Sequence, residues 1–101
     1  MTTLVLERDP VAIDVEVTDD QLIVRLADGR VVAAPLEWYP RLAHGTPEER
    51  NNYELLGHGT GIGWPDLDEH LSVASILAGR RSGESQRSFG RWLAARQAEA
   101  S

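Results

Sequence analysis

The chain has 101 residues, which is enough for one domain with a single modest hydrophobic core, and its net charge is −6. An acidic protein of this kind is a poor candidate for binding a nucleic-acid backbone, because that binding needs clustered basic residues. The absence of cysteine excludes disulfides, thiolate metal sites and cysteine nucleophiles. No apolar run approaches the roughly 18 residues of a membrane span and no secretory signal is visible, so we expect a cytoplasmic protein without membrane contact.

The first third of the sequence predicts three strands. Apolar and polar residues alternate over residues 11–17 and again over residues 22–26, with a turn at residues 18–20 between them. Asp28-Gly29 is typical of a two-residue hairpin turn, so the third strand is expected from Arg30 to about Leu36. Sequential strands joined by tight turns predict an antiparallel meander.

The length of the second turn decides which side chains share a face of this sheet. With two turn residues, Leu26 faces Val31 and Val24 faces Ala33, so these four residues are expected in the core. The opposite face then holds Ile23, Val32 and Ala34 beside Arg25. This half-apolar face is either ordinary exposed surface or a face covered by the C-terminal tail or by a partner.

Two short helical segments are expected next. The first runs from Glu37 to Ala43. The second has the signature of a capping box, in which Thr46 is the N-cap, Pro47 takes the first helical position and Glu49 follows three residues after the cap. It is expected to end at Asn51-Asn52.

Residues 53–64 predict a fourth strand. Glycine recurs there at every second position, so on a strand one face consists of Gly57, Gly59, Gly61 and Gly63. A glycine face permits close approach by another backbone, whereas the alternative is a loose, bulged strand or a loop. The spacing fits neither a dinucleotide-binding fingerprint nor a P-loop.

The C-terminal third predicts two helices. Ser72 is expected to cap a helix that ends at Gly79. His70 lies two positions before Ser72, but a helix cap explains this serine better than a role as a catalytic nucleophile does. Residues 80–85 have the composition of a linker, and residues 86–99 the spacing of an amphipathic helix. We therefore divide the chain into a domain of residues 1–79 and an arginine-bearing tail of residues 80–101.

The tail helix is expected to dock, because a helix of this length is marginally stable alone in water. Its apolar side consists of Phe89, Trp92 and Leu93. Two surfaces could receive it: the half-apolar face of the meander, or the same tail of a second protomer, which would give a homodimer.

Five motifs resemble a known family. They are Asp28-Gly29-Arg30, Pro35-Leu36, Tyr39-Pro40-Arg41-Leu42, Thr46-Pro47-Glu48-Glu49-Arg50 and Gly61-Ile62-Gly63-Trp64-Pro65-Asp66-Leu67-Asp68-Glu69. With them, residues 11–79 resemble DUF2442, a family of small bacterial proteins of unknown function. The resemblance implies an α+β fold, no established catalytic residues and, in some genomes, pairing with a second small protein in a toxin–antitoxin-like operon. Some members carry a helix-turn-helix domain behind this one, for which residues 80–101 are too short.

One segment has the residue types of a metal site. Oxygen and imidazole ligands suit Mg, Mn or Zn, and the candidates are His58, Asp66, Asp68, Glu69 and His70. Their spacing matches no dedicated metal motif, and acidic residues before a helix favour its positive end. We therefore expect structural roles and no cofactor, and we keep as the alternative a small metal-dependent enzyme or ligand-binding domain that uses Asp66–His70.

Aromatic and arginine side chains are the other candidates, since both are enriched at protein interfaces. The interaction candidates are Trp38, Tyr39, Arg41, Arg50, Trp64, Phe89 and Trp92. A place in the core is the alternative for Trp38, Tyr39 and Trp64, and Trp64 in particular is expected to anchor the core. The arginines of the tail indicate a solvated helix face or an arm that contacts a protein or, weakly, a nucleic acid.

The sequence as a whole predicts an α+β fold: an antiparallel meander of three strands plus a fourth, short helices and a C-terminal helix. We interpret the chain as a non-enzymatic protein-interaction module whose partner is another protein. The antitoxin-like role follows only from the family resemblance.

Overall fold

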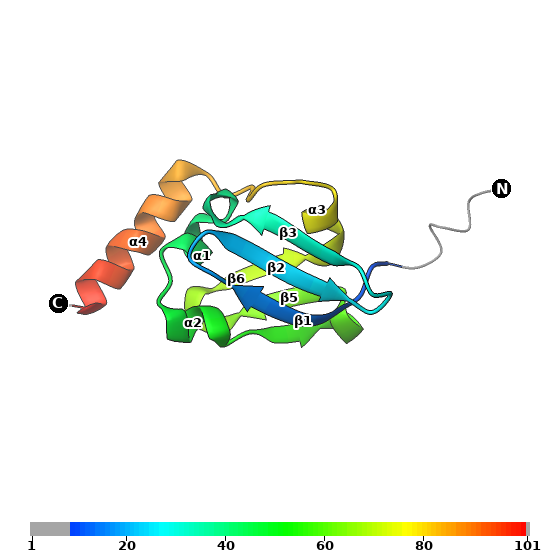
Figure 1. The fold of residues 1–101 in the computed structure, drawn as a ribbon. Coiled ribbons are helices and arrows are strands. Elements are labelled where there is room, and N and C mark those ends of the chain that lie inside the picture. The colour runs from blue at the N-terminus through cyan, green and yellow to red at the C-terminus, as the bar shows by residue number, and fades with distance from the viewer. Residues whose placement is uncertain (1–8, 101) are drawn as a thin grey trace.

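The computed structural model describes residues 9–100, which form two three-stranded antiparallel sheets with short helices and one longer C-terminal helix (Figure 1). The first sheet has the order β1-β2-β3, with strands Ala12–Val17, Gln21–Leu26 and Val31–Pro35. The second has the order β4-β5-β6, with strands Glu54–Leu56, Gly61–Trp64 and Glu69–Ser72. The predicted α+β class is confirmed.

Helical segments connect and flank the sheets. The 3-10 helix η2 (Leu36–Trp38) and the helices α1 (Pro40–Ala43) and α2 (Pro47–Asn51) join the first sheet to the second. Two further 3-10 turns, η3 (Gly57–Gly59) and η4 (Pro65–Leu67), lie within the second sheet, and α3 (Val73–Leu77) and α4 (Gln86–Ala100) follow it. No helix among the described residues is long and apolar enough to cross a membrane.

The turn between β2 and β3 has three residues, so the expected register is wrong. The amide of Leu26 donates to the carbonyl of Arg30 at 2.8 Å, and Gly29 takes a φ of +96° between them. Val24 therefore pairs with Val32, not with Ala33. A shift of one residue exchanges the faces of β3, because side chains alternate along a strand.

The core and outer faces of β3 are accordingly the reverse of those expected. Ala34 is buried and Val32 packs against the core, whereas Val31 is 52% exposed and Ala33 is exposed. On β1 an irregularity between Ala12 and Asp14 adds one residue, so Ile13 points outward, 59% exposed.

The expected fourth strand is two strands joined by a tight turn. Gly57 and Gly59 have φ values of +56° and +97°, which bend the chain at η3 instead of extending it. A Cβ atom on Gly59 would lie 2.6 Å from the carbonyl oxygen of Ala12, so this turn packs directly on β1. Only Gly61 and Gly63 share a strand face, and β6, which the sequence analysis missed, completes the sheet.

One core lies between the two sheets and the short helices. Its buried residues are Ala12, Val15, Leu22, Val24, Leu26, Ala34, Leu36, Tyr39, Leu42, Ile62, Trp64, Leu67, Val73 and Ile76. Trp64 has no exposed surface, and its indole nitrogen donates to the carbonyl of Arg50 at 3.0 Å. The prediction that Trp64 anchors the core is confirmed.

Both predicted helix caps are confirmed. The hydroxyl of Thr46 accepts the amide of Glu49 at 3.1 Å, and the Glu49 carboxylate accepts the amide of Thr46 at 2.9 Å. The hydroxyl of Ser72 accepts the amide of Ser75 at 3.1 Å at the start of α3. These bonds satisfy amides that a helix start leaves unpaired.

The C-terminal helix α4 packs in cis at the end of the sheets beside α1 and α2 (Figure 1). Phe89 stacks on Trp92 with 5.7 Å between ring centroids and meets the ring of His44 edge-on at 5.1 Å. Trp92 in turn has the guanidinium groups of Arg41 and Arg96 within 5.1 Å and 4.8 Å of its ring. Cation–π and aromatic contacts thus cover the apolar side of the helix.

This docking site is neither of the two expected surfaces. Val32 and Ala34 face inward, so the half-apolar face to which they were assigned does not exist as expected. The helix is instead held near its end by two hydrogen bonds from Arg96 to Glu49, at 2.8 Å and 3.0 Å. Glu49 also closes the capping box of α2, so the position of α4 is tied to that helix start.

Replacing Trp64 with alanine should destabilise the protein strongly, because the change empties the centre of the core. A buried aromatic residue truncated to alanine typically costs about 3–5 kcal/mol. Urea unfolding of Trp64→Ala should therefore show a much lower midpoint than wild type, or an unfolded chain. Trp38→Ala is the control, since its ring is only partly buried. Equal losses for the two variants would contradict the central position of Trp64.

Candidate functional site

The predicted interaction residues divide into interior and accessible groups. Tyr39 and Trp64 are 1% and 0% exposed, so neither presents a surface. The guanidinium of Arg50 donates hydrogen bonds to the carbonyls of Leu42 and Ala43, at 2.9 Å and 2.8 Å, and so caps the C-terminal end of α1. The partly accessible candidates are Trp38, Arg41, Phe89 and Trp92.

The predicted metal candidates do not converge. Asp66 accepts a hydrogen bond from Asn52 at 2.9 Å, and His58 lies in the η3 turn. Glu69 and His70 are neighbours on β6, so their side chains point to opposite faces of the sheet. Among residues 9–100, no three His, Asp or Glu side chains lie close enough together to hold an ion. The metal alternative therefore finds no support in this geometry.

A cleft of about 500 Å³ lies between β6, α3 and residues 80–84. We call it the β6 cleft, and we call residues 80–84 the strap. Residues 69–72 form one wall, and the strap forms the other. The volume is within the range of ligand-binding sites.

The strap is held in place at its first residue and at its middle. The amide of Ser82 donates to the carbonyl of Trp38 at 2.9 Å, and the hydroxyl of Tyr39 donates to the carbonyl of Arg80 at 3.2 Å. The expected linker is therefore a packed segment, held against the end of η2.

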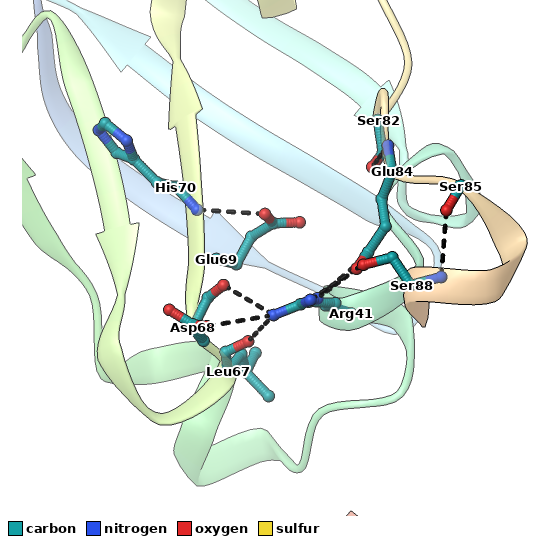
Figure 2. A network of polar contacts seen from close by, with 9 residues as sticks. All are labelled: Arg41, Leu67, Asp68, Glu69, His70, Ser82, Glu84, Ser85 and Ser88. Atoms are coloured by element: carbon teal, nitrogen blue, oxygen red, sulfur yellow. Dashed lines mark hydrogen bonds and ion pairs between the residues drawn. The ribbon is translucent and has the colours of Figure 1, made fainter. Parts of the chain in front are cut away.

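Arg41 joins the strap to the second sheet (Figure 2). Its Nε donates to the Glu84 carboxylate at 2.9 Å, and its Nη1 donates to the carbonyl of Asp68 at 2.9 Å. Glu84 also accepts the hydroxyl of Ser88 at 2.7 Å, which adds the first turn of α4 to the network. The hydrogen-bonded guanidinium lowers the pKa of Glu84, and the carboxylate raises the pKa of Arg41.

Glu69 is the least satisfied group of the cleft. Its Oε1 accepts the amide of His70 at 3.1 Å, while its Oε2 is buried and has no hydrogen-bond partner among the described residues. Burial raises the pKa of Glu69, although the amide of His70 and the charge of Arg41 favour the ionised form. Figure 2 shows the carboxylate between β6 and Glu84.

β6 is an edge strand whose free side belongs to the cleft. Val73, just after β6, donates its amide to the carbonyl of Thr60 at 2.9 Å. Antiparallel pairing alternates, so Leu71 and Glu69 also bond toward β5, and the backbone groups of His70 and Ser72 point away from it. On that side the amide of His70 donates to the Glu69 carboxylate at 3.1 Å, and the amide of Ser72 points the same way.

Two features of this site escaped the sequence analysis. Glu84 was assigned to a linker, and nothing in the sequence couples it to Arg41, which lies 43 positions away. β6 carried only a weak signal, because Glu69 and His70 are both polar and Leu71 is the one apolar residue of the strand. The capping signature of Ser72 and the acidic residues before it favoured a helix start instead.

Replacing Glu84 with glutamine should destabilise the protein at neutral pH and leave it unchanged in acid. The folded-state pKa of Glu84 is lowered, so its ionised form stabilises the fold above the unfolded pKa, and this contribution is lost as pH falls through the folded pKa. We expect Glu84→Gln to lose about 1.5–3 kcal/mol at neutral pH, the scale of a hydrogen bond between charged groups. Urea unfolding at several pH values measures it.

Glu37→Gln is the matched control, since it removes the same charge from an exposed side chain. It should change stability little at any pH. If Glu84→Gln were equally destabilising at neutral pH and well below the pKa of an ordinary glutamate, packing and not charge would hold the strap.

The fold recurs in solved structures. A crystal structure of a protein of unknown function from Rhodospirillum rubrum is similar with a TM-score of 0.66 and 26% sequence identity, covering 78% of this chain and 98% of that chain. A solution structure of an uncharacterized protein from Chromobacterium violaceum gives a TM-score of 0.62 at 22% identity, covering 80% of this chain and 74% of that chain. No curated protein matches the chain.

The sequence also matches a family model over most of its length. The model describes a protein of unknown function, DUF2442, and covers residues 12–82. This range contains both sheets, the short helices and the strap as far as Ser82, whereas Glu84 and α4 lie beyond it. The resemblance expected from the motifs is confirmed, and the chain belongs to the DUF2442 family.

Proposed function

We propose that this protein is a non-enzymatic protein-interaction module and that its partner binds at the β6 cleft. The observation that carries the proposal is the free edge of β6, which faces the cleft with backbone groups of His70 and Ser72. Unpaired strand edges are templates for another chain. Protein partners commonly use them by adding a strand.

The rim of the cleft has the composition of an interface. Arg80 and Arg81 are exposed strap residues that line it. The guanidinium of Arg81 lies 5.0 Å from the ring of Trp38. Arginine and tryptophan are enriched among the residues that dominate binding energy, so this rim suits a protein partner.

The polar side chains of the cleft already have structural tasks, which favours binding over catalysis. The hydroxyl of Ser72 donates to the hydroxyl of Ser75 at 2.7 Å and caps α3. The ring of His70 lies against Gly61 on the outer face of the second sheet. A serine nucleophile needs a base within hydrogen-bond reach, whereas the Ser72 hydroxyl donates to another hydroxyl, that of Ser75.

A narrower form of the proposal concerns the identity of the partner. The family resemblance implies pairing with a second small protein in some genomes, so we propose an antitoxin-like role with the product of a neighbouring gene as the first candidate. The net charge of −6 suits a basic partner, because complementary charge speeds encounter and disfavours wrong partners. Co-expression of the two proteins followed by co-purification tests this form separately.

A photo-crosslinking amino acid at position 80 tests the general proposal. Placed in the full chain in its native host, it should capture one discrete protein, because Arg80 lines the cleft and is exposed. The same amino acid at Arg87 is the control, since that residue is exposed on α4 and outside the cleft. Equal capture from both positions, or none from either, would contradict binding at the cleft.

A further inference from the structure

We infer that the partner enters the β6 cleft as an extended segment, which pairs with the free edge of β6 and brings a lysine or arginine side chain to Glu69. This inference rests on the proposed function and adds to it the form and the charge of the partner. It follows from three observations about the cleft.

The first observation is the state of the β6 edge. The amide of His70 donates to Oε1 of the Glu69 carboxylate at 3.1 Å. This oxygen therefore takes the position that a backbone carbonyl of an added strand would have. A partner carbonyl at that amide would release Oε1 of Glu69 for another donor. The next outward amide, that of Ser72, points away from β5 and offers a second point of attachment.

The second observation is the missing donor at Glu69. Its Oε2 is buried without a partner, and a buried acceptor left unpaired costs free energy. The cation nearest in the network is Arg41, which directs its donors to Glu84 and to the carbonyls of Leu67 and Asp68. A basic side chain from outside would supply the charge-assisted hydrogen bond that the fold itself does not.

The third observation is charge, which argues against a second copy of this chain as the occupant. Pairing two β6 edges would bring together two sets of cleft carboxylates, from Asp68, Glu69 and Glu84, in a protein with a net charge of −6. Like charges across paired strands are destabilising. A basic segment of a different protein avoids this repulsion.

The geometry also sets a pattern for the partner. Side chains of an added strand alternate between the two faces, as those of β6 do. Residues on one face point inward with Glu69, and those on the other lie beside His70 and Ser72. We therefore expect a single basic residue flanked by alternating small polar and β-branched residues.

Three synthetic peptides test the charge. They share a labelled seven-residue sequence of alternating Thr and Val and differ only in the central residue, which is Lys, Met or Glu. With the full chain, fluorescence anisotropy should give the Lys peptide at least about tenfold tighter binding than the Met peptide, and the Glu peptide the weakest. Equal binding of all three, or none by the Lys peptide, would overturn the inference.

Glu69→Gln tests the residue. It should abolish the preference for the Lys peptide while the chain stays folded, because burial already favours the neutral form of this side chain. Glu16→Gln is the matched control, since Glu16 is exposed on the outer face of the first sheet and carries the same charge. The control should retain the full preference, and an equal loss in both variants would mean that only net charge matters.

N-methylation of the Lys peptide, one amide at a time, tests the strand pairing. Alternate amides of an added strand face β6, so methylation should weaken binding at every second position. Uniform loss, or no loss, would overturn the strand-pairing part. If position 80 captures a partner but the Lys peptide fails to bind, this inference fails and the proposed function stands; if neither occurs, both fail.

Discussion

The hydrogen-bonded ion pair between Arg41 and Glu84 is the interaction on which the cleft depends. Both side chains are largely buried, at 14% and 13% exposure, so the pair is shielded from solvent. Arg41 also holds the turn before β6, and Glu84 holds Ser88 at the start of α4. One guanidinium therefore fixes the distance between the strap and β6. The opening between them is the space that a partner would use.

Glu69 illustrates how such a site is maintained at the expense of stability. A carboxylate that is half satisfied and turned to the interior raises the free energy of the folded state when it is ionised. Its raised pKa means that its ionisation lowers stability as pH rises through that pKa. The same unpaired oxygen is the acceptor to which the proposed basic side chain of a partner would donate.

The sequence was informative wherever the decisive interactions are local. The capping box at Thr46, the cap at Ser72 and the central place of Trp64 were all predicted, because each follows from residue types within a few positions. The faces of β3 were predicted wrongly, because one extra residue in the turn at Gly29 moves every side chain to the other side. The pairing of Arg41 with Glu84 could not be predicted, since only the tertiary fold brings them together.

The central claim is that the outer edge of β6 is open, and amide hydrogen exchange measured by NMR tests it most directly. Adjacent amides on this strand should behave differently in the free protein. The amide of Leu71 bonds toward β5 and should exchange slowly, whereas that of Ser72 faces the cleft and should exchange fast. Protection of Ser72 equal to that of Leu71 would mean that the edge is already paired, and would contradict the account.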